Sequence, residues 1–143
     1  MKKIIAFLLT SLFILLVGCT AEPAEKFIFT IDEPKTTLTV GEKVTYTVKL
    51  KNCTNREYSL AHGLPLMSVY IVNADDESEF LIGTILTHTD IKAGETIEKN
   101  CKFQPMEAGE YLLKTFCHFK VDSEEYDLAK EAIPITVLPE KES

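Results

Sequence analysis

The sequence predicts an all-β fold, an antiparallel β-sandwich of about seven strands that follows a cleaved N-terminal signal segment. Short runs of β-branched and aromatic residues recur at nearly regular spacing, and Gly, Asn, Asp and Pro separate them. No amphipathic helix of useful length occurs, and no internal repeat occurs either. This combination is typical of sandwiches and not of helical or mixed folds.

The first 18 residues are predicted to be an export signal. Lys2 and Lys3 precede an apolar run from Ile4 to Val17, and a secretory signal has this charged start, apolar core and small-residue end. The run is shorter than the ~20 residues that a spanning helix needs. The Thr, Glu and Pro residues behind it also fit cleavage better than an uncleaved membrane anchor.

The mature chain of about 125 residues suits one domain and not two. Small and charged residues interrupted by Pro23 predict a flexible tether before the first strand. The expected organisation is a signal peptide (1–18), a tether (19–26), a sandwich (27–138) and a polar tail (139–143).

Three extended segments are predicted in the first part of the domain. Phe27–Ile31 is a β-branched and aromatic run that ends before Pro34, and Thr36–Val40 continues in extended conformation. Lys43–Asn52 alternates apolar and polar residues over its whole length, which indicates a strand with one buried face. The apolar face consists of Val44, Tyr46, Val48 and Leu50.

Five further segments complete the predicted strand set. Turn residues bound Leu66–Val72, Phe80–Thr87, Thr96–Phe103, Tyr111–Val121 and Ile133–Leu138. We interpret residues 122–131 as a long hairpin loop with at most one helical turn. Pro134 predicts an edge position for the last strand, because proline cannot donate a hydrogen bond to a neighbouring strand.

One local motif makes the sandwich immunoglobulin-like. The sequence Glu107-Ala108-Gly109-Glu110-Tyr111 resembles the tyrosine corner at the entry to the sixth strand of immunoglobulin-like domains. The Tyr111 ring is expected to be buried and its hydroxyl to return to the backbone near the turn.

The charge balance restricts the partners. The chain has 15 Lys and Arg against 22 Asp and Glu, and without Lys2 and Lys3 the balance is 13 against 22, a net charge of −9. Nucleic-acid binding needs clustered cations, so no nucleic acid is expected as a partner. The same charge disfavours peripheral binding to anionic lipid.

Cysteine spacing leaves the redox state open. Cys101 and Cys117 each lie eight residues from Gly109, and alternation points both into the sandwich. A disulfide between them is one expectation, and two reduced, buried thiols are the other. Cys53 lies at the matching end of its own strand and competes as a partner for Cys117.

The sequence predicts neither a catalytic site nor a bound metal or cofactor. His62, His88 and His118 lack ligand spacing relative to the cysteines and Met67, and no C-x-x-C pair occurs. No serine has the surroundings of a nucleophile elbow. The alternative function is a metal-binding or redox-sensitive domain that uses these cysteine and histidine side chains.

A predicted loop is the candidate binding surface. The segment from Glu57 to Pro65 mixes aromatic, apolar and polar residues, and loops on sandwiches commonly carry recognition. The candidate binding residues are Tyr58, Leu60, His62 and Leu64. A structural interpretation is that Leu60, Leu64 and Pro65 cap one end of the sandwich.

The segment Leu16-Val17-Gly18-Cys19 resembles the lipobox of bacterial lipoproteins. The resemblance implies that Cys19 is acylated and becomes the first residue of the mature protein. It also implies a domain anchored in the lipid bilayer of a bacterial cell membrane, on the extracytoplasmic face.

The domain resembles the intracellular proteinase inhibitor (BsuPI-like) family over about residues 36–138. The resemblance rests on Asn52-Cys53-Thr54-Asn55, the following Leu66–Val72 segment, Ile91-Lys92-Ala93-Gly94-Glu95 and the Gly109–Tyr111 corner. It implies the sandwich fold and a non-catalytic module that binds a protein, with a protease as the specific case. The chain departs from the family pattern because it has no tryptophan.

Overall fold

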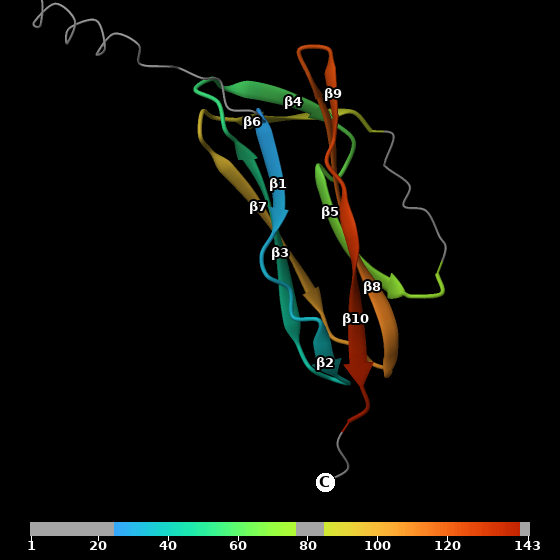
Figure 1. Cartoon of the computed structure of the whole chain (residues 1–143). Coiled ribbons are helices and arrows are strands. Elements are labelled where there is room, and N and C mark those ends of the chain that lie inside the picture. The colour runs from blue at the N-terminus through green and yellow to red at the C-terminus, as the bar shows by residue number, and fades with distance from the viewer. Residues whose placement is uncertain (1–24, 77–84, 141–143) are drawn as a thin grey trace, which may run out of the picture.

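Two packed β-sheets form the domain in the computed structural model, which describes residues 25–76 and 85–140 (Figure 1). Cys19, the predicted lipidation site, lies outside the described residues, as does the Phe80–Thr84 part of one predicted strand. The described strands are β1 (Phe27–Ile31), β2 (Thr37–Thr39), β3 (Val44–Asn52), β4 (Tyr58–His62), β5 (Met67–Asn73), β6 (Thr87–Ile91), β7 (Thr96–Phe103), β8 (Gly109–Val121), β9 (Glu124–Asp127) and β10 (Lys130–Leu138).

The fold is an immunoglobulin-like β-sandwich, as the sequence predicts. One sheet has the order β1-β3-β7, and the second has the order β2-β10-β8-β4-β6, with β5 and β9 also paired to β8. The 13-residue β8 is long enough to hold β10 and β5 along its first half and β9 and β4 near its end. No helix that could cross a bilayer is found in the two described ranges.

The N-terminal strand changes sheets part-way. β1 pairs antiparallel with β3, and its pairing ends where the Asp32 amide donates to the Thr47 carbonyl (3.0 Å). After Pro34, β2 joins the second sheet and pairs in parallel with β10. The sandwich is therefore mixed and not purely antiparallel, because proline cannot continue the β1 hydrogen-bond ladder.

Two segments predicted as loops are strands. Tyr58–His62 forms β4, and the predicted hairpin loop 122–131 contains β9 and the start of β10. The β8–β9 connection has only two residues, Asp122 (φ 50°) and Ser123 (φ 68°). Two successive positive φ angles are the requirement of a type I′ hairpin turn, which Asp tolerates but which is usually signalled by Asn-Gly or Asp-Gly. The predicted strand 80–87 also differs from the structure in its described part, because Thr87 is the first residue of β6 and not the last residue of a strand.

Pro134 lies where β10 has a free edge among the described strands. β2 covers β10 only at Thr136–Leu138, and the Thr136 amide donates to the Thr36 carbonyl (2.8 Å), away from β8. By alternation the Pro134 nitrogen also faces away from β8. Proline therefore removes no bond from the β8–β10 ladder.

Two clusters of buried side chains fill the sandwich. The first lies around Phe27, Leu50, Leu60 and Phe119, and the second around Leu38, Tyr46, Leu113 and Ile135. The predicted inner face of β3 is confirmed, since Tyr46, Val48 and Leu50 are all buried. Tyr46 satisfies its hydroxyl by donating to the Lys35 carbonyl (2.9 Å).

The tyrosine corner is present. The Tyr111 hydroxyl donates to the Glu107 carbonyl (3.0 Å), and its half-buried ring contacts the Phe103 ring edge-on at 5.8 Å. Gly109 has a φ of 154°, in the region that glycine adopts most readily. The corner fixes the start of β8.

Tyr111→Phe should lower the free energy of unfolding by about 1 kcal/mol, because it removes one hydrogen bond and keeps the ring. Urea unfolding measures this. Glu107→Ala is the matched control, since the acceptor is a backbone carbonyl, and it should change stability much less. Equal losses of stability in the two variants would contradict a stabilising hydrogen bond from the Tyr111 hydroxyl.

A buried asparagine at the end of β3 holds two turns together. The Asn52 amide nitrogen donates to the carbonyls of Arg56 (2.7 Å) and Lys92 (2.9 Å) and lies 3.4 Å from that of Ile91. Its side-chain oxygen accepts from the amide (3.0 Å) and hydroxyl (2.8 Å) of Thr54. Every polar atom of this fully buried side chain is therefore satisfied.

Asn52→Ala should cost about 2–4 kcal/mol of unfolding free energy, because it leaves several turn carbonyls and an amide without their partner. Urea unfolding is again the measurement. Asn55→Ala, at an exposed position in the same turn, should stay within about 0.5 kcal/mol of the parent. A small effect at Asn52 would mean that water replaces the amide.

Candidate functional site

The segment predicted as a binding loop is largely strand β4, and two of its four candidate residues are buried. Leu60 is 0% exposed, and His62 is 4% exposed. The Tyr58 ring lies edge-on to Phe27 at 5.5 Å and carries the Arg56 guanidinium at 5.7 Å. Leu64 alone among the four candidates is well exposed, at 52%. Leu64 and Pro65 are exposed, so Leu60 is the one residue of the three whose burial fits the capping interpretation. The overlooked signal was the period-two spacing of the Tyr, Leu and His residues.

Of the two expectations for Cys101 and Cys117, the structure has the reduced thiols and not the bridge. Both residues face inward, as alternation predicts, but Cys53, Cys101 and Cys117 are free thiols in the structure. Cys117 lies in the first core cluster, whereas Cys101 pairs in register with Tyr46 of the second. Cysteines on facing sheets can bridge when they lie directly opposite each other, as in immunoglobulin domains, but a disulfide needs Cα atoms within about 7 Å, and these two belong to different parts of the interior. A shared interior therefore does not bring two cysteines into bonding distance.

The histidines are dispersed. Both ring nitrogens of His62 have partners, with Nδ1 2.6 Å from the Gly63 carbonyl and Nε2 2.7 Å from the Thr89 hydroxyl. His118 lies on the outer face, where it stacks on Phe116 and faces the Glu125 carboxylate (3.2 Å). Within the two described ranges, no three His, Cys, Asp or Glu side chains gather as metal ligands would.

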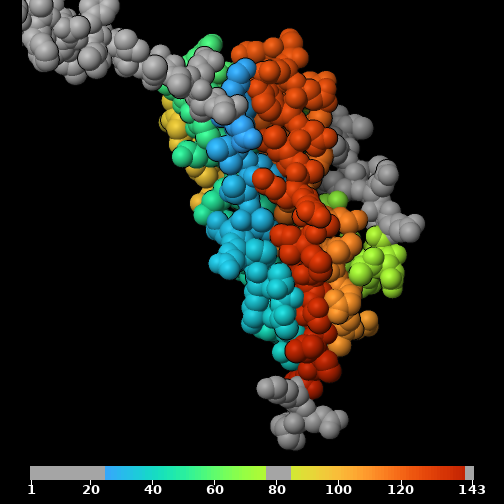
Figure 2. Space-filling view, in the orientation of Figure 1, coloured from blue at the N-terminus to red at the C-terminus, as the bar shows by residue number. Residues whose placement is uncertain are grey.

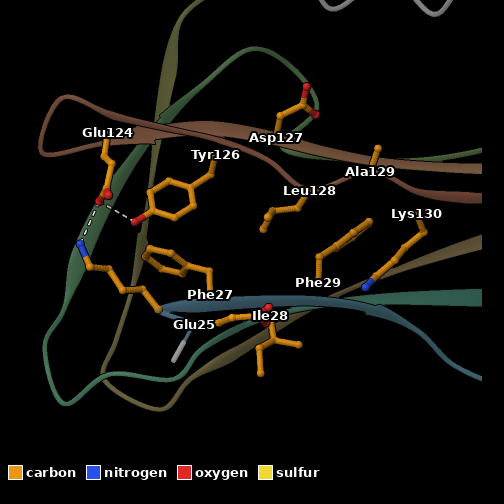
Figure 3. Close-up of a pocket in the computed structure, with 11 residues that line it drawn as sticks. Glu25, Phe27, Ile28, Phe29, Glu124, Tyr126, Asp127, Leu128, Ala129 and Lys130 are labelled. Carbon is orange, nitrogen blue, oxygen red and sulfur yellow. Dashed lines mark hydrogen bonds and ion pairs between the residues drawn. The ribbon is translucent and has the colours of Figure 1, made fainter. Parts of the chain in front are cut away.

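A groove separates the free edges of the two sheets. It has a volume of about 450 Å³ and runs between β1 and the β9–β10 segment, which lie side by side on one face of the molecule (Figures 2 and 3). Apolar side chains from both strands point toward one another across it: Phe27, Phe29, Tyr126 and Leu128. Its charged lining residues are Glu25, Lys26, Glu124, Asp127 and Lys130.

Aromatic rings form the base of this groove. Phe27 meets Phe119 and Tyr126 edge-on at 5.0 and 5.1 Å, and Phe119 stacks on Tyr126 at 5.0 Å. Edge-on and stacked pairs of this kind stabilise by roughly 0.5–1.5 kcal/mol each beyond their burial. The groove therefore has a rigid apolar base that is built from both sheets.

An ion pair closes one end of the groove. Lys26 Nζ lies 2.8 Å from Glu124 Oε2, which also accepts from the Tyr126 hydroxyl at 2.7 Å. The hydrogen bond from Lys26, then that from Tyr126, holds the pKa of Glu124 below its usual value. The same pair raises the pKa of Lys26. Because both groups are exposed, salt screens the pair.

The β1 wall of the groove carries backbone N–H and C=O groups that have no strand partner in the described part of the chain. The Cys53 amide donates to the Lys26 carbonyl (2.9 Å), and the Asp32 amide donates to the Thr47 carbonyl. In an antiparallel pair, bonded and non-bonded positions alternate. Ile28 and Thr30 therefore bond to β3, while the N–H and C=O groups of Phe27, Phe29 and Ile31 face the free edge. The sequence does not predict this site, because the free edge of β1 depends on which strands lie beside β1 in the folded chain.

No family model matches the chain, and no curated protein matches it. Solved structures are similar to it at low identity. The CARDB domain of a Pyrococcus furiosus protein, solved in complex with di-metal ions, is 16% identical with a TM-score of 0.47, covering 80% of this chain and 94% of that one. A PapD-like domain of human CEP192 is 12% identical with a TM-score of 0.44, covering 90% and 95%.

A β-glucosidase from Erythrobacter marinus is similar over one part of its length. It is 12% identical with a TM-score of 0.47, covering 78% of this chain, which spans only 15% of the enzyme.

Burial of Cys117 predicts an alkaline loss of stability. Desolvation raises the pKa of its thiol from about 9 to about 12. Above pH 9 the unfolded chain loses this proton and the folded chain keeps it, so rising pH favours unfolding. Between pH 8 and pH 10 the parent should lose about 1.4 kcal/mol more unfolding free energy than Cys117→Ala. Urea unfolding in reductant tests this, and parallel pH profiles would contradict it.

Proposed function

We propose that this chain is a bacterial lipoprotein, held at the extracytoplasmic face of the cell membrane by acylated Cys19, whose sandwich binds another polypeptide without catalysing a reaction. The observation that carries the binding part is the groove between β1 and β9–β10. The groove has an apolar base, and one of its walls carries backbone N–H and C=O groups that have no partner among the described strands. These are the features that an extended peptide requires when it adds a strand to a sheet edge.

The position of the groove suits an anchored protein. β1 begins at Phe27, eight residues after Cys19, so the groove starts directly behind the proposed tether. A chain of this length spans at most about 26–29 Å. A partner in the groove would therefore be held close to the bilayer surface.

The groove favours polypeptide over nucleic acid. Two lysines and three carboxylates line it, and Lys26 is already paired with Glu124. Phosphate backbones need a surplus of free cations, which this lining does not supply. An extended backbone needs only the hydrogen-bonding edge and an apolar base.

Proteinase inhibition has less support than binding in general. An inhibitor would present an exposed loop, and the segment expected to do so has Leu60 and His62 buried in β4. Inhibition therefore rests on the family resemblance alone. The metal-binding or redox-sensitive alternative would need ligands or low-pKa thiols to converge, but burial raises the pKa of both Cys101 and Cys117.

Anchoring is tested with Cys19→Ala in bacteria fed a labelled fatty acid. The parent should carry label and sediment with membranes, and the variant should lose the label. Loss of membrane association without loss of label would contradict acylation at this residue.

Binding is tested with a photo-reactive amino acid at Lys130, inside the groove, in the full chain in cells. Irradiation should give an adduct with a polypeptide. The same probe at Lys102, an exposed position on β7, is the matched control and should give much less. Equal adducts at both positions would contradict a role for the groove.

A further inference from the structure

The geometry of the β1 edge points to a second copy of this chain as the partner that pairs with it. We propose that two β1 strands pair antiparallel about a twofold axis at Phe29, which joins two three-stranded sheets into one of six strands. This inference rests on the proposed function, because it names the polypeptide that binds along the β1 wall of the groove.

The hydrogen-bonding groups needed for this pairing are already aligned. Phe27, Phe29 and Ile31 present their backbone N–H and C=O groups to the free edge, as the β1–β3 register requires. With Phe29 opposite Phe29 of the second copy, Phe27 lies opposite the second copy's Ile31. All three positions then form hydrogen-bonded pairs.

The β1 edge lacks the features that keep strand edges from associating. Natural edges are protected by charged residues, proline or bulges, and Phe27–Ile31 contains no charged residue, proline or glycine. The opposite edge of the same sheet, β7, carries Glu98, Lys99 and Lys102. The β9 edge of the second sheet carries three carboxylates.

The same register makes the outer face of β1 complementary to itself. Lys26 lies opposite the second copy's Asp32, so opposite charges lie near each other at both ends of the pair, where Lys26 also has Glu124 and Asp32 also has Lys49 as a partner within its own chain. Between them, Ile28 lies opposite the second copy's Thr30. Ile28 is 38% exposed, and the pairing would cover it. If the pairing were shifted by one residue, Lys26 would no longer lie opposite the second copy's Asp32.

Membrane anchoring supplies the concentration that a short interface needs. Pairing of one five-residue edge buries less surface than the ~1,000 Å² expected of a stable soluble complex. Two anchored copies meet at a much higher effective concentration. In the antiparallel pair the two Lys26 residues are offset by about 20 Å along the strands. Each tether spans at most about 26–29 Å, so both acyl groups can reach one bilayer.

Disulfide trapping in membranes tests the pairing. In the full-length chain, Ile28→Cys and Thr30→Cys together place thiols at non-hydrogen-bonded positions, where opposite Cα atoms lie about 4.5 Å apart, a distance that disulfides accept. Mild oxidation should give a covalent dimer of twice the chain mass. Thr45→Cys with Thr47→Cys is the matched control, because it has the same spacing and the same outer face but lies on interior strand β3.

Charge exchange tests the register. Lys26→Glu in the trapping variant should reduce the dimer several-fold, because the introduced carboxylate would face the second copy's Asp32. Adding Asp32→Lys should restore it. Both intrachain pairs, Lys26–Glu124 and Lys49–Asp32, stay broken in that exchange, so recovery cannot come from the fold of one copy.

Three outcomes would overturn the proposal: dimer no more abundant than in the Thr45/Thr47 control, no recovery on charge exchange, or trapping of a different protein at Ile28 and Thr30. The last outcome would leave the groove's binding function standing. Absence of any adduct at Lys130 would instead remove the proposed function itself.

Discussion

The sandwich depends on one buried side chain, the amide of Asn52. The chain crosses from the first sheet to the second between β3 and β4, and it returns between β6 and β7. The Asn52 side chain bonds to backbone groups of both crossings, and its own backbone amide donates to the Glu95 carbonyl (2.9 Å). Because the Asn52 side chain is fully buried, it has no water to replace these partners, and the two crossings are held side by side. This link fixes one end of the sandwich.

The groove results from a mismatch between the two sheets at their shared edge. β1 leaves the first sheet after Ile31, and β2 covers β10 only near its C-terminal end. Among the described strands, β1 and the part of β10 before Thr136 therefore each have an unpaired edge. The two strands lie side by side on the face seen in Figure 2. Aromatic rings from β1, β8 and β9 close the interior below, which makes an open edge compatible with a dry core. An edge that is stable yet unpaired is a surface on which another strand can bind.

Tethering gives this edge a consistent role. The strand that follows the proposed anchor is also the strand with free backbone groups, so the proposed anchor and the proposed binding edge lie next to each other in the chain. The ion pair between Lys26 and Glu124 connects the start of β1 to the second sheet, and its exposure makes it sensitive to salt. Core side chains, not this pair, hold the domain together.

The sequence by itself determined the fold class, the inner face of β3 and the tyrosine corner, because alternation and turn chemistry are local properties of the chain. It also determined that Cys101 and Cys117 face inward. Tertiary structure decided whether those thiols meet, since residue order does not say which parts of the two sheets lie opposite each other, and Cys117 and Cys101 belong to different parts of the interior. It decided that Leu60 and His62 are core residues of a strand. It decided, finally, that β1 has a free edge, because an edge is defined by which strands are absent beside it.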